Sequence, residues 1–287
     1  MQSLAVPSRR AGVPSRALAT LLALVAALAA AFVVAPPRLV ATGSDGDLAD
    51  HRHLVAAVRA AVVGYWRSGD VSYPPAVQRV VDYWYRFHLV KGGIAALLLI
   101  VLGVLTVLLW RTFLRADGLR MGSRAALASA GAAVASLALF ALAVVMANVQ
   151  GALAPFASLL PMLTQGTPDA RTAGTLAQAR QQLTGSHRTG GYTPPALNTM
   201  VSDVGWYHAV LAVIALVVVV ALLGLSAICW RALVRVGAAD RRTRWAWGGF
   251  AVGSVLSSLI VAVLLVANAG VAMDPAPALL GLLNGGF

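Results

Sequence analysis

The chain has 287 residues, of which 59% are hydrophobic and only 11% are charged. Soluble globular proteins carry about 25% charged residues, so this composition excludes an ordinary soluble domain and indicates a protein that crosses a membrane. The net charge of +12 does not indicate nucleic-acid binding, because the basic residues flank long apolar runs.

Five apolar runs are each about 20 residues long, the length that a helix needs to cross a bilayer. They cover residues 17–35, 89–110, 125–149, 209–230 and 246–269. We therefore predict an all-α integral membrane protein with five transmembrane helices. The first run follows several arginines, as in a secretory signal peptide. Pro36 directly after its small residues favours a retained signal-anchor; cleavage would leave four spans.

Arginine is distributed unevenly along the chain. Three segments together hold twelve Arg and only two Asp. They are the segment before the first span, the turn between the second and third spans, and the turn between the fourth and fifth spans. Because basic residues resist translocation, we predict that these segments are cytoplasmic and that the N-terminus is inside. Loops 36–88 and 150–208 and the C-terminus are then extracytoplasmic. The arginines would also contact anionic lipid headgroups at the cytoplasmic face.

The cell type follows from residue usage. The chain contains 21 Arg but one Lys and no Glu, which is typical of a high-G+C bacterial genome. We therefore expect a multi-pass protein of the bacterial plasma membrane.

The sequence contains an internal repeat. GYWRSGDVSYPPA at 64–76 resembles GSHRTGGYTPPA at 185–196, and a shift of 120 residues aligns Trp110 with Trp230 and Asn148 with Asn268. Each predicted unit is an outer loop followed by two spans, related by an axis along the membrane normal. The predicted divisions are 1–36 (N-terminus and signal-anchor span), 37–155 (first repeat), 156–275 (second repeat) and 276–287 (extracytoplasmic tail).

The outer loops are predicted to be partly helical. Apolar residues at steps of three and four indicate a helix over 47–64, with a counterpart over 169–184. Gly64 and Gly185 are the predicted helix ends. Proline pairs at 74–75 and 194–195 suit the first turn of a new helix, and the aromatic residues at 83–85 suit the outer membrane interface.

Two repeated pairs are candidate ligand-binding residues. Arg67 and Arg188 lie in the repeated loop, where they could hold a lipid headgroup, a phosphate or a carboxylate, or could bond loop carbonyls or an Asp. Asn148 and Asn268 lie toward the outer ends of their spans. They could flank a central site, or they could cap helices or bond between helices.

A stripe of small residues, Gly249, Gly253 and Ser257, is a candidate helix-packing surface, either between the repeats or against a partner. The five histidines form no recognised metal spacing and none repeats cleanly, so we predict no metal site and no cofactor. The sequence also has no motif for a catalytic residue.

These observations favour a non-catalytic membrane component, an accessory or scaffolding subunit of a bacterial envelope complex with a protein partner in the membrane. The alternative is a small-molecule or lipid permease that uses the seam between the repeats. A third possibility is an envelope enzyme that acts on a lipid-linked substrate through the loop arginines. No nucleic-acid partner is expected.

Overall fold

The computed structural model describes residues 15–115, 120–189, 194–238 and 240–286, with side chains excluded at 15 and 186–189. These residues form helices and connecting turns, with no strand among them. Five helices are long and apolar enough to cross a membrane, which agrees with the predicted multi-pass, all-α class. They are α1 (Ser15–Val40), α3 (Pro75–Arg115), α4 (Met121–Leu153), α7 (Pro195–Arg235) and α8 (Arg241–Met273).

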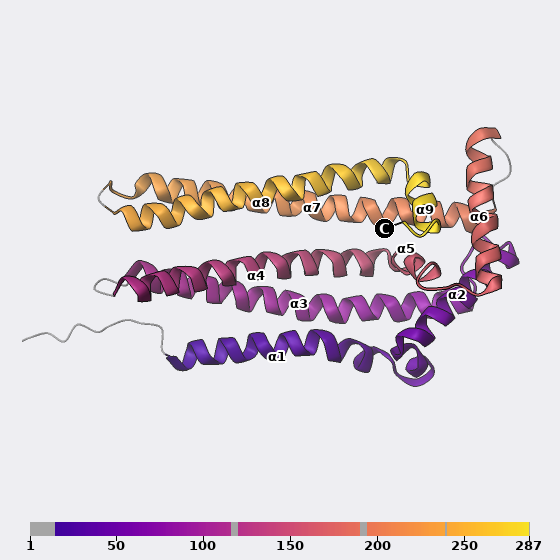
Figure 1. Ribbon diagram of the computed structural model, residues 1–287, viewed down its shortest axis with the longest axis horizontal. Helices are drawn as coiled ribbons and strands as arrows, with labels where there is room; N and C mark the ends of the chain where they lie inside the picture. Colours follow the sequence, from indigo (N-terminus) through magenta and orange to yellow (C-terminus); the bar gives the residue numbers. More distant parts are fainter. Residues whose placement is uncertain (1–14, 116–119, 190–193, 239, 287) are drawn as a thin grey trace, which may run out of the picture.

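The five long helices run side by side along the longest dimension of the molecule (Figure 1). Helices α3 and α4 form one antiparallel hairpin, and α7 and α8 form a second. The hairpins meet mainly through α4 and α7, while α1 packs on α3. We call the end of the bundle with the α3–α4 and α7–α8 connections the turn end, and the opposite end the cap end.

The remaining helices gather at the cap end, where α6 stands across the direction of the long helices (Figure 1). Together with the first turns of α3 and α7 they form a unit that we call the cap. The cap helices are η1 (Gly43–Ala49), α2 (His51–Ser68), α5 (Pro155–Leu159), η2 (Leu160–Leu163), α6 (Ala170–Thr189) and α9 (Ala276–Leu283).

Local sequence explains where the cap helices begin and end. The Asp50 side chain accepts hydrogen bonds from the first backbone N–H groups of α2, and Asp169 does the same at α6. Helix α2 ends where Gly69 adopts φ +69°, a left-handed conformation that favours glycine. The prediction that Gly64 and Gly185 end these helices is wrong, because both glycines lie inside them.

The hairpin helices begin at corresponding prolines. Helices α3 and α7 start at Pro75 and Pro195, as predicted, and each has 41 residues. Proline suits this position because its missing N–H would have no partner in the first turn. Helices α4 and α8 each have 33 residues and also start 120 residues apart.

The cap has one hydrophobic core, drawn from both halves of the chain. Tyr65 and Tyr83 from the first half pack in the same cluster as Leu160, Leu197 and Leu279, and each is at most 1% exposed. Fully burying one such side chain contributes about 1.5–3 kcal/mol. The interface role predicted for Tyr83 is therefore wrong, because its ring lies inside this core.

The long helices pack much less tightly than the cap. Their contact across the two hairpins centres on Met146 of α4 and Ala215, Val218 and Leu222 of α7. Large apolar side chains elsewhere face outward, including Val263, which is 69% exposed. Such surfaces are stable in a lipid environment but not in water, which is consistent with membrane insertion.

Candidate functional site

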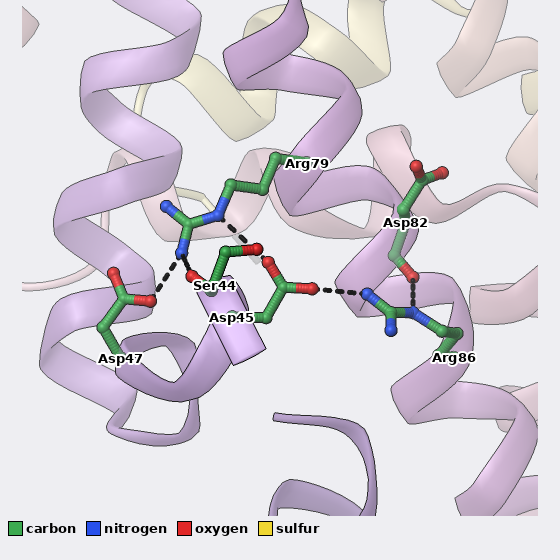
Figure 2. Close-up of polar contacts among 6 residues, drawn as sticks. All are labelled: Ser44, Asp45, Asp47, Arg79, Asp82 and Arg86. Carbon is green, nitrogen blue, oxygen red and sulfur yellow. Dashed lines mark hydrogen bonds and ion pairs between the residues drawn. The ribbon is translucent and has the colours of Figure 1, made fainter. Parts of the chain in front are cut away.

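An ion-pair network joins η1 to the first turns of α3 (Figure 2). The Asp45 carboxylate accepts from Arg79 Nε at 3.0 Å and from Arg86 Nη2 at 2.6 Å. Arg79 Nη2 also donates to Asp47 at 2.5 Å and to the Ser44 carbonyl. The Asp45 side chain is only 12% exposed. Burial alone would raise its pKa, but hydrogen bonds and charge from Arg86 and Arg79 outweigh burial and lower the pKa.

The same figure places Asp82 outside the carboxylate network. Arg86 Nε donates to the backbone carbonyl of Asp82 at 3.2 Å, while the Asp82 carboxylate points away (Figure 2). Arg79 and Arg86 of α3 thus both hold the segment that follows α1. The network fixes the connection between the first span and the cap.

Two further arginines tie the cap helices to the segments that follow α4 and α8. Arg59 of α2 donates from Nε to the Met162 carbonyl at 3.3 Å and also bonds the Gln165 and Thr167 carbonyls. Arg180 of α6 donates from Nε to the Leu283 carbonyl at 2.9 Å. These carbonyls lie at or just beyond helix ends, where no intrahelical N–H is available to them. Each arginine therefore acts as a strut between helices.

The predicted loop arginines lie elsewhere. Arg67 is exposed in the last turn of α2, and its side chain has no hydrogen bond or ion pair to the residues that the structure describes. The Arg188 side chain and Gly190 lie outside the described residues. The contacts with loop carbonyls expected of Arg67 are instead made by Arg59. Anion binding by the loop arginines stays a prediction.

A tyrosine–aspartate pair connects the two halves of the cap. The Tyr73 hydroxyl donates to the Asp203 carboxylate at the start of α7, and Tyr65 donates to Thr199 Oγ1 at 3.0 Å. Burial, and then the hydrogen bond to Asp203, raise the pKa of Tyr73. The tyrosine thus remains a neutral donor, which suits a structural bond.

The two predicted asparagines are buried, and each faces the first helix of its own hairpin. Asn268 Nδ2 donates to the Leu264 carbonyl at 2.8 Å, which leaves Oδ1 to accept from His208 Nδ1 at 2.7 Å. Asn148 Nδ2 likewise donates within α4, to Val144 at 2.8 Å. Its Cβ lies close to Gly92 of α3. The structure therefore places these side chains within separate hairpins.

The sequence analysis missed a repeated histidine. His88 and His208 are separated by the same 120 residues as the helix starts, at corresponding positions of α3 and α7. His88 Nδ1 donates to the Trp84 carbonyl at 3.0 Å, and its ring packs directly on Gly151. The same shift of 120 residues that aligns Trp110 with Trp230 also aligns these two histidines in the sequence.

Polar contacts between the hairpins lie near the cap end. Gln150 Nε2 of α4 donates to the Tyr207 carbonyl of α7 at 3.1 Å. Trp206 Nε1 donates to the Leu153 carbonyl at 2.9 Å. The second bond satisfies a carbonyl at the end of α4, and both bonds hold the two hairpins together just below the cap.

The predicted small-residue stripe lies in the turn-end half of α8. Gly249, Gly253 and Ser257 line a cavity of about 510 Å³ among α3, α4, α7 and α8. A Cβ at Gly249 or Gly253 would meet no atom within 4 Å. These two glycines therefore face open space within this chain. Packing of the stripe against a partner stays a prediction.

Two buried nitrogen atoms at the turn end lack a hydrogen-bond partner among the described residues: Trp110 Nε1 and Arg124 Nε. The Trp110 ring lies against Gly131 of α4 and makes an edge contact with Phe250 of α8. Trp110 therefore packs between the hairpins, beside the cavity.

The described part of the chain contains no group of three or more His, Cys, Asp or Glu that could hold a metal ion. Its polar side chains in the cap are mostly engaged with one another or with backbone carbonyls, as bonds that hold helices together. Comparison with protein-family models, with curated proteins and with solved structures gave no match for the chain.

Proposed function

We propose that the protein is a non-catalytic component of a bacterial plasma membrane, an accessory or scaffolding subunit of an envelope complex. One observation carries this proposal. A tightly bonded cap holds two helical hairpins that pack against each other through few buried side chains and present broad apolar surfaces. A rigid cap above loosely packed spans is suited to holding other membrane components in a fixed arrangement.

The proposed orientation has the cap outside the cell and the turn end in the cytoplasm. Charge distribution supports it. Arg16 of α1 lies at the turn end, as do the arginines at the ends of α3 and α7 and at the starts of α4 and α8. The described aspartates other than Asp240 lie at the cap end. Basic residues mark the cytoplasmic side of membrane proteins.

The proposed duplication, 37–155 and 156–275, gains support from equal helix lengths and a constant shift. The two struts also correspond. Arg180 follows Arg59 by 121 residues, and their acceptor carbonyls, at Leu283 and Met162, are also 121 residues apart. The Arg180 partner lies in the predicted C-terminal tail, so we propose that α9 completes the second repeat.

Photo-crosslinking in cells tests the scaffolding role. A photoreactive residue at Val217 or Val263, which are 64% and 69% exposed, should give a discrete adduct with one membrane protein. Ala215 is 0% exposed and is the matched control, which should give none. Adducts with lipid alone at both exposed positions would argue against a protein partner.

The cavity between the hairpins favours one alternative, a permease for an apolar solute or lipid. Transport would require the hairpins to move apart at the turn end. Flux of a labelled lipid between leaflets of vesicles containing the purified protein would support that alternative, and flux no faster than in protein-free vesicles would remove it.

A further inference from the structure

An apolar hollow follows α8 from the turn end toward the middle of the bundle. One cavity, of about 630 Å³, lies between Leu233 of α7 and the α8 residues from Arg244 to Leu256. The second, of about 510 Å³, lies among the four hairpin helices. Trp245, Gly249 and Gly253 line both cavities, so the glycine face of α8 is a low ridge between two adjoining lobes.

The length of this hollow matches one leaflet of a bilayer. Arg244 and Leu256 bound the α8 part of the first cavity. At 1.5 Å per residue they are about 18 Å apart along the helix axis. Half the hydrocarbon thickness of a bilayer is about 15 Å. In the proposed orientation, a hollow of this length would span about one leaflet.

The mouth of the hollow is positively charged. Arg244 lines the first cavity, and its Nη1 donates to the Val236 carbonyl at 3.3 Å. Its other guanidinium N–H groups have no partner among the described residues. Trp245 lies beside it, and tryptophan favours the headgroup zone. A charged donor above an apolar hollow is complementary to a phosphate attached to hydrocarbon.

We propose that this hollow binds one anionic diacyl phospholipid of the cytoplasmic leaflet. The phosphate lies at Arg244, and the two acyl chains occupy the lobes on either side of Gly249 and Gly253. A partner helix fits less well, since a helix with side chains is at least about 10 Å wide and 18 Å of it fills roughly 1,400 Å³. That volume is more than twice that of either lobe, of about 630 and 510 Å³.

The lipid site relies on the proposed orientation but not on a scaffolding role. A protein with no partner protein would still bind the lipid, and a scaffold could lack the site. The two proposals therefore fail separately, because the crosslinking test reports a protein partner and the test below reports lipid retention.

The test is native mass spectrometry of the purified full-length chain, delipidated and then titrated with phosphatidylglycerol or with phosphatidylcholine of the same acyl chains. The unmodified protein should retain one phosphatidylglycerol in preference to phosphatidylcholine. Gly253→Leu fills the hollow and should abolish retention. Gly270→Leu, at an open position nearer the cap end of the same helix, should leave it unchanged.

Substitution at the mouth tests the headgroup contact. Arg244→Gln should weaken phosphatidylglycerol retention about fivefold, the effect of removing one arginine near an anionic lipid. Arg231→Gln, a turn-end arginine that does not line the hollow, is the control and should have a smaller effect. Equal effects of the two substitutions would mean unspecific charge attraction and would overturn the proposal. Equal retention of the two lipids, or retention by a folded Gly253→Leu, would also overturn it.

A second measurement needs no substitution. Phosphatidylglycerol with a photoreactive acyl chain, added to the unmodified protein in vesicles, should form adducts concentrated between Trp245 and Leu256. Adducts spread evenly over the outward faces of α1 and α8 would refute a seated lipid. This readout stays decisive even where the leucine variant fails to fold.

Discussion

Replacement of Asp45 by Asn should destabilise the cap by about 2 kcal/mol. The substitution preserves shape but removes the negative charge that Arg79 and Arg86 share. Each charge-assisted hydrogen bond is worth about 1.5–3 kcal/mol when desolvated. The Arg79 and Arg86 side chains are 39% and 43% exposed, so water can rehydrate them once the charge is removed. The stability lost with each of the two bonds therefore falls to about 1 kcal/mol.

Asp47 supplies a matched control on the same short helix. It also pairs with Arg79, but its side chain is 53% exposed. An ion pair this exposed contributes about 0.2–1 kcal/mol, so Asp47→Asn should change the free energy of unfolding by about 0.5 kcal/mol or less. Burial of the Asp45 carboxylate and its second arginine partner together account for the predicted difference between the two variants.

Unfolding in mixed detergent micelles, followed by tryptophan fluorescence, measures both variants. Trp66 and Trp84 lie in or against the cap core and report on its loss. The pH dependence gives a second check. Because the pKa of Asp45 is lowered on folding, its contribution is complete above its unfolded pKa of about 3.9 and is lost as the pH falls toward its folded pKa. The curves of unfolding free energy against pH for the unmodified protein and for Asp45→Asn should therefore converge only below about pH 4. An Asp45→Asn protein no less stable than Asp47→Asn at pH 7 would refute the reasoning.

Three further predictions concern the struts, the orientation and a close helix contact. Arg59→Gln should lower the free energy of unfolding by about 2 kcal/mol because it leaves carbonyls at helix ends unpaired, whereas Arg67→Gln should change it by under about 0.5 kcal/mol; equal losses in a denaturation series would contradict the assignment. In a cysteine-free background, a single cysteine at the exposed Ser68 should react with an impermeant thiol reagent in cells whose outer envelope is permeable to it, and one at Ser123 should not; the reverse pattern would invert the proposed topology. Gly151→Ala should destabilise the protein by about 1–3 kcal/mol, because the new Cβ would lie 2.3 Å from the His88 ring; the loss should shrink in a His88→Ala background, and an equal loss in both backgrounds would show that this contact is not the cause.

Much of the architecture was readable from local patterns. Span number follows from run length, because a lipid environment requires long apolar helices whose backbone bonds are internal. The starts of α3 and α7 follow from Pro75 and Pro195, since proline is compatible with only a few helix positions. The end of α2 was predicted wrongly at Gly64. Tertiary burial of Tyr65, one residue later, extends the helix beyond a residue with weak helix propensity.

The candidate sites were less predictable, because sequence spacing does not reveal which side chains meet. Arg59 and Arg67 are on the same helix, yet only Arg59 faces the carbonyls after η2. Asn148 and Asn268 could be identified as a repeated pair, but their separation into different hairpins depends on which helices pack together.

The sequence by itself determined the membrane class, the number of long apolar helices and several helix starts, because these depend on composition and on residues close together in the chain. Only the tertiary structure decided that the two halves share a single cap core and that Gly249 and Gly253 face a hollow. Those outcomes depend on packing between residues more than 100 positions apart, such as Tyr65 and Leu197. Long-range packing is set by the combined shape of many side chains, which no local pattern encodes.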